Sequence, residues 1–188
     1  MGYWHDEEKV EQYVGATEGY DGRALVEVLQ RHLPEGASVL ELGMGPGKDL
    51  AILAETYPVT GSDVSGAFVD RYLAAHPGAD VMVLDAATIE TDRVFDGVYS
   101  NKALIHLGRD ELAASFRRQA EVLAPGGVGV HSFWAGDGEE TFDGLRFVHH
   151  TVATLRLAIG SALDVVAVER YTEDAAGDSL VVVVRRPA

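Results

Sequence analysis

Three glycines that alternate with other residues follow a short apolar run. Residues 39–48 read VLELGMGPGK, with glycines at 43, 45 and 47. Glycine lets a ligand approach the backbone closely and tolerates positive φ angles. A buried strand that runs into such a turn and then into a helix is typical of a nucleotide-type binding unit. The loop is a weak signal by itself, because a tight strand-to-helix turn without a ligand can have the same glycines.

Two acidic residues follow later apolar segments and narrow the choice of ligand. Asp63 lies twenty positions beyond Gly43, where a carboxylate can accept hydrogen bonds from ribose hydroxyls. Asp85 could accept a hydrogen bond from an exocyclic amine such as that of adenine, although residues 85–88 could equally form a capped turn. A dinucleotide fingerprint would need a glycine at position 48, where this chain has lysine.

His106 is the candidate for acid–base chemistry. It follows Asn101 by five residues, and the pKa of histidine lies near neutrality. A packing or capping role is equally compatible with its position. Several aromatic and histidine residues of the later polar stretch could wall a substrate pocket or form a core under a loop: Trp134, Phe142, Phe147, His149 and His150. We expect no metal site, because adjacent histidine side chains diverge and no carboxylate spacing completes a ligand set.

Strands alternate with helices around these residues. Hydrophobic spacing predicts helices over 3–16, 22–33, 47–56, 67–75, 110–123 and 151–161, with Ser65 as an N-cap of the fourth. Strands are predicted over 38–42, 59–62, 80–84, 95–100, 128–133, 165–171 and 179–185. Residues 135–150 read as polar and irregular.

This alternation predicts an α/β fold with a doubly wound, mostly parallel, Rossmann-like sheet. No helix separates the last two strands, so we expect them to form an antiparallel hairpin at one edge. Ligands of such sheets bind beyond the carboxyl ends of the strands. In this chain those ends carry the glycine loop, Asp63, Asp85 and Asn101.

Four motifs occur in the order of a known family. They are ELGMGPG at 41–47, the acids at 63 and 85, SNKALIHL at 100–107 and LAPGG at 123–127. Over about residues 37–134 the chain resembles the class I S-adenosylmethionine-dependent methyltransferases. It resembles most a group of small bacterial members of undefined substrate, whose HSFW-like segment it shares at 131–134. The terminal hairpin fits the seven-stranded sheet of the family.

The resemblance implies S-adenosylmethionine as the cofactor and S-adenosylhomocysteine as its product. Glu41 would lie near the methionine amino group or support the loop, and the backbone carbonyl of Asn101 would accept from the same amino group. Tyr13 or Tyr20 would reach the cofactor carboxylate from the N-terminal helices. Three glycines would pass under the methionine and ribose parts of the cofactor: Gly43, Gly45 and Gly47.

The resemblance also assigns the adenosine end of the cofactor. Asp63 would bind the ribose hydroxyls, and Val64 would flank the adenine. Asp85 would take the adenine amino group, with Ala86 supplying a backbone N–H. Residues 1–188 would then form a single methyltransferase domain, with N-terminal helices over 1–34 and an acceptor-side loop and helix over 135–162.

The predicted function is in-line methyl transfer to a small-molecule acceptor, with His106 as general base where the acceptor must lose a proton. Nucleic acid is disfavoured because the formal net charge is −15 and an acidic surface repels phosphates. The run after position 101, NKAL, also differs from the Asn-Pro-Pro-aromatic run of enzymes that methylate amide or base nitrogens. Two alternatives stay open: a non-catalytic S-adenosylmethionine-binding module and an NAD-dependent oxidoreductase.

Composition limits the chemistry and the location. The chain has no cysteine, which excludes disulfides, thiolate metal sites and cysteine nucleophiles within it. No stretch approaches the roughly 18 apolar residues of a membrane span, and the polar start MGYWHDEEK does not resemble a signal peptide. We therefore expect a cytoplasmic protein that does not bind membranes. The sequence does not indicate its oligomeric state.

Overall fold

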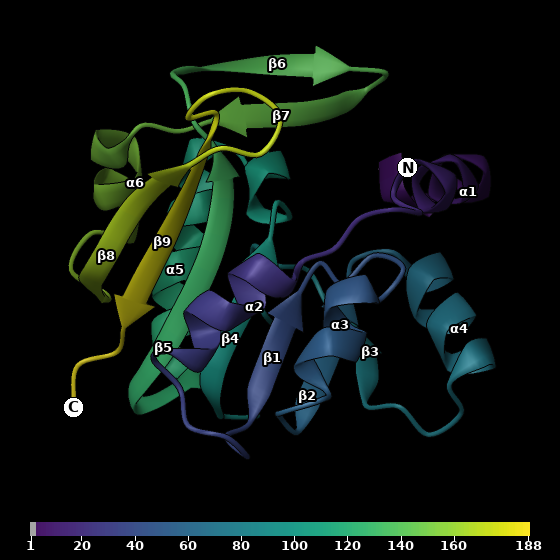
Figure 1. The fold of residues 1–188 in the computed structure, drawn as a ribbon, viewed down its shortest axis with the longest axis horizontal. Coiled ribbons are helices and arrows are strands. Elements are labelled where there is room, and N and C mark those ends of the chain that lie inside the picture. Colours follow the sequence, from purple (N-terminus) through teal and green to yellow (C-terminus); the bar gives the residue numbers. More distant parts are fainter. Residues whose placement is uncertain (1–2) are drawn as a thin grey trace.

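Seven strands form one sheet at the centre of the computed structural model, which describes residues 3–188 (Figure 1). The strands are β1 (Val39–Leu42), β2 (Val59–Asp63), β3 (Val81–Val83), β4 (Phe95–Asn101), β5 (Leu123–Trp134), β8 (Asp164–Tyr171) and β9 (Ser179–Arg185). Their order is β3-β2-β1-β4-β5-β9-β8. The first five are parallel, and β9 runs antiparallel to both β5 and β8. The predicted doubly wound sheet and its antiparallel hairpin are confirmed.

Strand β9 is buried on both faces, which explains why it is an apolar run and does not alternate with polar residues. In β9, Val182 and Val184 belong to one hydrophobic core, whereas Val181 and Val183 belong to the other. Successive side chains of a strand point to opposite faces, so one valine run supplies both layers.

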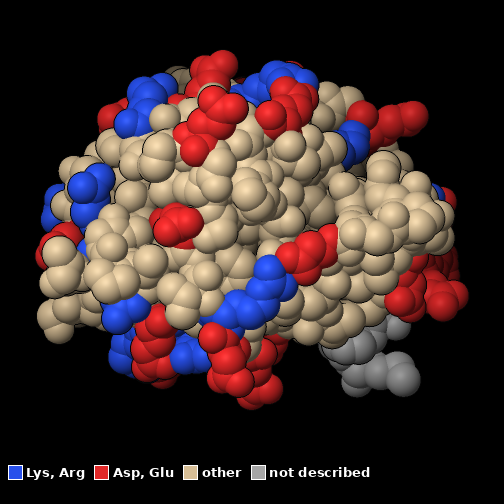
Figure 2. Space-filling model, turned by 90° about the horizontal axis from the view of Figure 1, so that it is seen from below, with Lys and Arg blue, Asp and Glu red and all other residues tan. Residues whose placement is uncertain are grey.

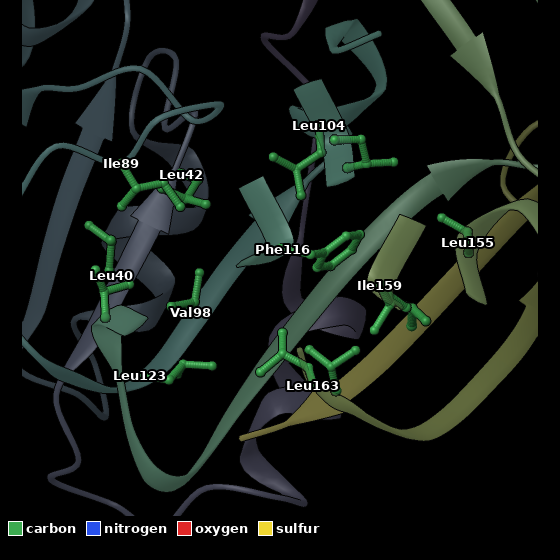
Figure 3. Close-up of a cluster of buried hydrophobic side chains, with 14 of the residues drawn as sticks. Leu40, Leu42, Ile89, Val98, Leu104, Phe116, Leu123, Leu155, Ile159 and Leu163 are labelled. Atoms are coloured by element: carbon green, nitrogen blue, oxygen red, sulfur yellow. The ribbon is translucent and has the colours of Figure 1, made fainter. Parts of the chain in front are cut away.

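Helices cover the two faces. α5 (Arg109–Val122) and α6 (Val152–Ile159) contribute to one core, and α2 (Arg23–Gln30) and α3 (Lys48–Leu53) contribute to the other. In Figure 3, Phe116 of α5 and Ile159 of α6 lie over the same side of the sheet. α6 buries Leu155 and Ile159 in this core, and of residues 135–162 only Gly144, Leu145 and Arg146 line the main cavity described below.

Four further elements complete the chain before β5. They are η1 (Tyr3–His5), α1 (Glu7–Ala16), α4 (Gly66–Ala75) and the 3-10 turn η2 (Leu104–His106). α4 packs against β2 and β3, and η2 packs against β5. Ser65 occupies the predicted N-cap position of α4, but its side chain makes no capping hydrogen bond.

The sequence predicts an irregular segment over residues 135–150, but the structure is regular there. These residues contain a separate hairpin of β6 (Gly138–Phe142) and β7 (Leu145–His149). Asp143 and Gly144 connect the strands with φ angles of 51° and 85°. An Asp-Gly pair with positive φ at both positions is a favoured two-residue hairpin turn. This turn signal is present in the sequence, but all of β6 is exposed and gives no apolar alternation.

One strand begins earlier than predicted. Helix α5 ends at Val122 and β5 begins at Leu123, which pairs with Phe95 before a register shift. Pro125 has no backbone N–H and disfavours helical geometry in the residue before it. The helix therefore ends ahead of the Pro125-Gly126-Gly127 run, and the chain enters the sheet directly.

Candidate functional site

A cavity of about 420 Å³ lies at the carboxyl-terminal ends of the parallel strands, which point upward in Figure 1. A hollow of about 60 Å³ shares part of its wall. Most of the predicted site residues line the larger cavity: Tyr13, Gly43, Gly45, Asp63, Val64, Asp85, Ala86, Asn101 and His106. Tyr20 and Glu41 line only the smaller hollow, and Gly47 lines neither.

The glycine loop requires glycine for two different reasons. Gly43 and Gly45 have φ angles of 70° and 50°, which lie in the left-handed region. A Cβ on Gly43 would also lie 2.4 Å from the Cβ of Ala103, so the loop packs directly against the turn after β4. Gly47 has φ 82° and would meet the Tyr72 ring at 2.2 Å. Gly47 is therefore required by the packing of the start of α3, away from the cavity.

Asp63 ties the glycine loop to the end of β2. Its Oδ2 accepts from the backbone N–H of Gly45 at 2.9 Å, and its Oδ1 accepts from that of Ser65 at 2.8 Å. Burial raises the pKa of Asp63, while these two N–H donors lower it. A carboxylate oxygen has more than one lone pair, so further donors such as hydroxyls could still bind from the cavity.

Asp85 caps a turn and also lines the cavity. Its Oδ1 accepts from the backbone N–H of Ala87 at 2.8 Å, and its carbonyl accepts from Ile89, so it caps a turn. It also lines the cavity and is exposed. The cap fixes the carboxylate at the rim without burying it.

Two buried carboxyl groups lie beside the smaller hollow. Glu41 is 3% exposed and Asp49 is 7% exposed. Oε2 of Glu41 and Oδ1 of Asp49 have no hydrogen-bond partner among residues 3–188. Burial, together with the charges of Asp49 and Asp63, raises the pKa of Glu41 well above its usual value. Unpaired buried carboxyl oxygens are costly, and a cationic group in the hollow would supply the missing donors.

Asp49 was absent from the residues predicted to form the site. Its Oδ2 accepts from the Tyr99 hydroxyl at 2.7 Å and from Nδ2 of Asn101 at 2.9 Å. Nδ2 of Asn101 also donates to the Tyr20 hydroxyl at 2.6 Å. In the sequence Asp49 looks like an ordinary acid in the first turn of a helix, which is favourable with or without a ligand.

His106 lies at the other end of the cavity among apolar and aromatic side chains. Its Nδ1 is 2.7 Å from the carbonyl oxygen of Arg146. A carbonyl oxygen can only accept, so Nδ1 carries the proton and Nε2 is the acceptor of the neutral ring. Burial lowers the pKa of His106, which favours this neutral form. The ring packs edge-on against Trp4 and Phe147, with centroid distances of 5.6 and 4.9 Å.

The β6–β7 hairpin lines the cavity with residues other than the aromatic and histidine candidates of 134–150. The hairpin contributes Gly144, Leu145 and Arg146 to the cavity. The candidate residues of 134–150 do not line either space. Instead Trp134 lies under the Lys102 ammonium, Phe142 is 75% exposed, Phe147 supports His106, His149 faces Glu140 and His150 packs on Phe133.

No metal cluster is present within residues 3–188, since no group of three or more His, Asp or Glu side chains there could hold an ion. His131 is buried and its Nδ1 lies 2.8 Å from the Ser100 hydroxyl, while burial lowers its pKa to about 3. It is therefore a neutral core histidine. None of the helices described is long and apolar enough to cross a membrane.

Comparisons with known proteins agree with this geometry. A family model described as a methyltransferase domain matches residues 39–127. The chain is 33% identical over 141 residues to an O-methyltransferase of Pyrenophora dematioidea, covering 67% of this chain and 49% of that protein. It is 37% identical over 111 residues to a trans-aconitate 2-methyltransferase of Variovorax paradoxus, covering 56% of this chain and 42% of that one. The chain thus spans about half the length of the curated relatives it matches.

A solved structure shares the whole architecture. A TehB-like methyltransferase from Corynebacterium glutamicum, described as dependent on S-adenosylmethionine, superposes with a TM-score of 0.77. The match covers 96% of this chain and 100% of that chain at 18% identity. At this identity the likeness concerns the fold alone.

Proposed function

The chain belongs to the class I S-adenosylmethionine-dependent methyltransferases, and we propose that it methylates a small-molecule acceptor that carries a dissociable proton, a hydroxyl being the first class to test. One observation carries the proposal. At one end, beside the glycine loop, the main cavity is lined by the buried Asp63 and adjoins the smaller hollow with the buried Glu41 and Asp49, and its wall elsewhere carries the neutral His106. The acidic end suits a cationic donor, and the histidine suits removal of a proton.

The side chains of the site fit S-adenosylmethionine. The unpaired oxygens of Glu41 and Asp49 offer acceptors for its ammonium group beside the smaller hollow. Tyr13, Tyr20 and Asn101 line the same hollow and would hold the rest of the methionine end. The adenosine end would lie along a wall with two carboxylates and several apolar groups: Asp63, Val64, Phe68, Leu84, Asp85 and Ala86.

When bound, S-adenosylmethionine supplies a methyl group on a sulfonium sulfur, which a nucleophile can displace in line. The protein has to orient the acceptor and accept its proton. Nε2 of His106 can take that proton, and the Arg146 carbonyl holds the ring in the required tautomer. The aromatic packing of Trp4 and Phe147 around the ring limits access of water.

The chemistry of the acceptor follows from the wall near His106. Tyr3, Trp4, Leu107 and Leu145 make this region mainly apolar, and Arg146 is its charged member. A flat or apolar small molecule with one ionisable oxygen would match it. The name of one relative, an O-methyltransferase, supports an oxygen acceptor, and that of another, a trans-aconitate 2-methyltransferase, supports a small-molecule one. Residues 1–34 would cover the donor side through α1, and residues 144–146 would cover the acceptor side.

A nucleic-acid partner has less support. The net charge is −15, and basic side chains on the face in Figure 2 lie among acidic ones. Arg23 pairs with Glu55 and Arg93 pairs with Asp80, so parts of the basic surface are already neutralised. A cytoplasmic location stays a prediction from the sequence, to be checked by fractionation.

The test starts with ligand titration. S-adenosylhomocysteine should bind the wild-type protein in isothermal titration calorimetry, whereas NAD should not compete. The Asp49→Asn variant should bind about tenfold more weakly, because an amide is a poorer partner for an ammonium than a carboxylate. Preferential binding of NAD would overturn the proposal in favour of an oxidoreductase.

Catalysis is tested separately with methyl-labelled S-adenosylmethionine and a panel of small hydroxylated and carboxylic compounds. Transfer of label to one class, dependent on His106, is the expected result. Tight S-adenosylhomocysteine binding without transfer to any class would favour a non-catalytic binding module.

A further inference from the structure

Lys102, the residue after β4, has a backbone conformation that side chains rarely adopt. Its φ angle is 52°, in the left-handed region that glycine enters most easily. Such strained residues persist only where their surroundings hold them in place, and they cluster at functional sites. Lys102 also lines the main cavity beside Asn101.

The ammonium of Lys102 is held by an enclosed group of side chains, here called the lysine cage: Trp134, Tyr171, Glu173 and Ser179. Nζ lies 2.8 Å from Oε2 of Glu173, donates to the Ser179 hydroxyl at 2.7 Å and lies 3.3 Å from the centroid of the Trp134 ring. The Lys102 side chain is 14% exposed. A partly desolvated ammonium over an indole face is strongly attracted to it.

Backbone and side-chain hydrogen bonds connect Lys102 to Asn101 and Asp49, at the end of the cavity proposed for the methyl donor, here called the donor end. The N–H of Lys102 donates to the Ser132 hydroxyl at 2.9 Å, and that hydroxyl donates to Oδ1 of Asn101 at 2.5 Å. Nδ2 of Asn101 then donates to Asp49. Asn101 is thus oriented from both ends of its amide group.

The same turn supports the glycine loop. Ala103 lies where a Cβ of Gly43 would fall, at 2.4 Å. A shift of residues 101–103 would therefore change the contact of Ala103 with the glycine loop. It would also break the hydrogen bond between Asn101 and Asp49. The cage is formed by the ends of β5 and β8, the start of β9 and Glu173 in the segment between β8 and β9, all remote in sequence from the glycine loop.

We propose that Lys102 is a positioning residue for the methyl donor: its ammonium, fixed in the lysine cage, holds the strained turn that sets Asn101 against Asp49 and Ala103 against Gly43. This rests on the proposed function, since it assigns the donor to that end of the cavity. Lys102 itself need not touch the donor.

Two variants separate the charge from the strain. Lys102→Met keeps the stem and the unfavourable φ but removes the ammonium, whereas Lys102→Gly removes the side chain and relieves the strain. S-adenosylhomocysteine should bind the Met variant about tenfold more weakly than wild type, and the loss of affinity in the Gly variant should be smaller. The KM for S-adenosylmethionine should likewise rise more in the Met variant than in the Gly variant, and the KM for the acceptor should stay unchanged. Arg23→Met, which removes a cation from an exposed pair, is the control.

Fluorescence reports the cage directly. The sequence has two tryptophans, so a Trp4→Phe background leaves Trp134 as the only emitter. Adding Lys102→Met to this background should shift the Trp134 emission. If the Met variant does not fold, Glu173→Gln, which keeps the shape and removes the charge partner, should give the same direction of effect on affinity.

Two results would overturn the inference: unchanged affinity in the Met or Gln variant, or a larger loss in Gly than in Met. These are distinct from a failure of the proposed function, which would appear as no S-adenosylhomocysteine binding by the wild-type protein. A destabilising role alone would lower the melting temperature of the variants without changing affinity per folded molecule.

Discussion

The two ends of the cavity are built in different ways. The end that we propose for the methyl donor is formed by the ends of the central strands and the loops that follow them, and its residues are joined by hydrogen bonds, as in the Asp63–Gly45 and Asp49–Asn101 contacts. The acceptor end is formed by η1, η2 and the β6–β7 hairpin, which are outside the seven-stranded sheet. There the rings of Trp4 and Phe147 pack on His106, and among the described residues no chain of hydrogen-bonded side chains like that of the donor end reaches this histidine.

This difference separates what the fold determines from what can vary. Strand ends in a buried sheet are fixed by the cores on both faces, so groups attached to them keep their positions. Loops and hairpins on a scaffold tolerate change and commonly carry specificity. The donor end should therefore be general to the architecture, and the acceptor end particular to this chain.

The largest effect is expected from His106. His106→Ala should lower kcat by about 10²- to 10⁴-fold, the usual contribution of a general base, and leave the S-adenosylhomocysteine Kd unchanged. His106→Gln, which can donate to the Arg146 carbonyl but is no base, should behave like the alanine variant. A change in Kd in both variants would show that the two ends are not independent.

The pH profile sharpens the same assignment. Burial lowers the pKa of His106 and the neutral form is the active one, so kcat/KM should be lost only as the pH falls through this lowered value. The acid limb should therefore lie below the usual range for histidine. It should disappear in His106→Gln, and a limb that persists there would belong to another group.

Asp63→Ala should give the next largest effect, and at the donor end only. It leaves the N–H groups of Gly45 and Ser65 without their partner, which should cost about 2 kcal/mol or more of unfolding free energy. The S-adenosylhomocysteine Kd should rise by roughly 10- to 100-fold. Asp63→Asn keeps one acceptor oxygen and should be intermediate. Unchanged affinity in a folded Asp63→Ala protein would refute the donor role.

The hairpin turn tests the acceptor end with a matched pair of glycines. Gly144 has φ 85° and Gly78 has φ 88°, and a Cβ at either would meet no atom within 4 Å. Replacement by alanine should cost about 1 kcal/mol at each position because of the positive φ. Only Gly144→Ala should raise the acceptor KM, by a few-fold, in steady-state assays. Equal effects of the two variants on that KM would remove the hairpin from the acceptor site.

The smallest expected effect concerns Glu41 and stability. The folded protein raises the pKa of this carboxyl above its unfolded value, so its favourable contribution is present at low pH and is lost as the pH rises through the raised pKa. In the absence of S-adenosylmethionine, the free energy of unfolding of Glu41→Gln in urea should exceed that of wild type by about 1 kcal/mol at pH 8. The difference should be smaller at pH 5. It should bind S-adenosylhomocysteine more weakly. Parallel stability curves across this pH range would contradict the assignment.

The sequence predicts the donor end much better than the acceptor end. Apolar runs, the glycine loop and the acids after the strands are local signals, and the sheet brings them together at one edge. The roles of Gly43 and Gly47 cannot be separated from sequence, because the neighbour that requires each glycine, Ala103 or Tyr72, is remote in the chain. Asp49 was missed because an acid in the first turn of a helix needs no ligand to be favourable.

The acceptor end depends on packing between segments that give weak local signals. The exposed β6 strand has no apolar alternation, so only its Asp-Gly turn indicated a hairpin. The tautomer of His106 depends on a carbonyl forty positions away. Lys102 combines a left-handed φ with contacts to Trp134 and Glu173, which lie far from it along the chain, so the conformation cannot be read from the types of its neighbours.

The position of β9 has a consequence for how this protein is made. The last strand along the described chain lies inside the sheet, between β5 and β8, and six of its seven residues are buried. While a ribosome is still synthesising that segment, β5 is paired only with β4, and both cores are open along the side that β9 will occupy. The nascent chain must therefore postpone closure of the sheet until translation has passed β9, and during this interval it exposes an edge that a chaperone could recognise.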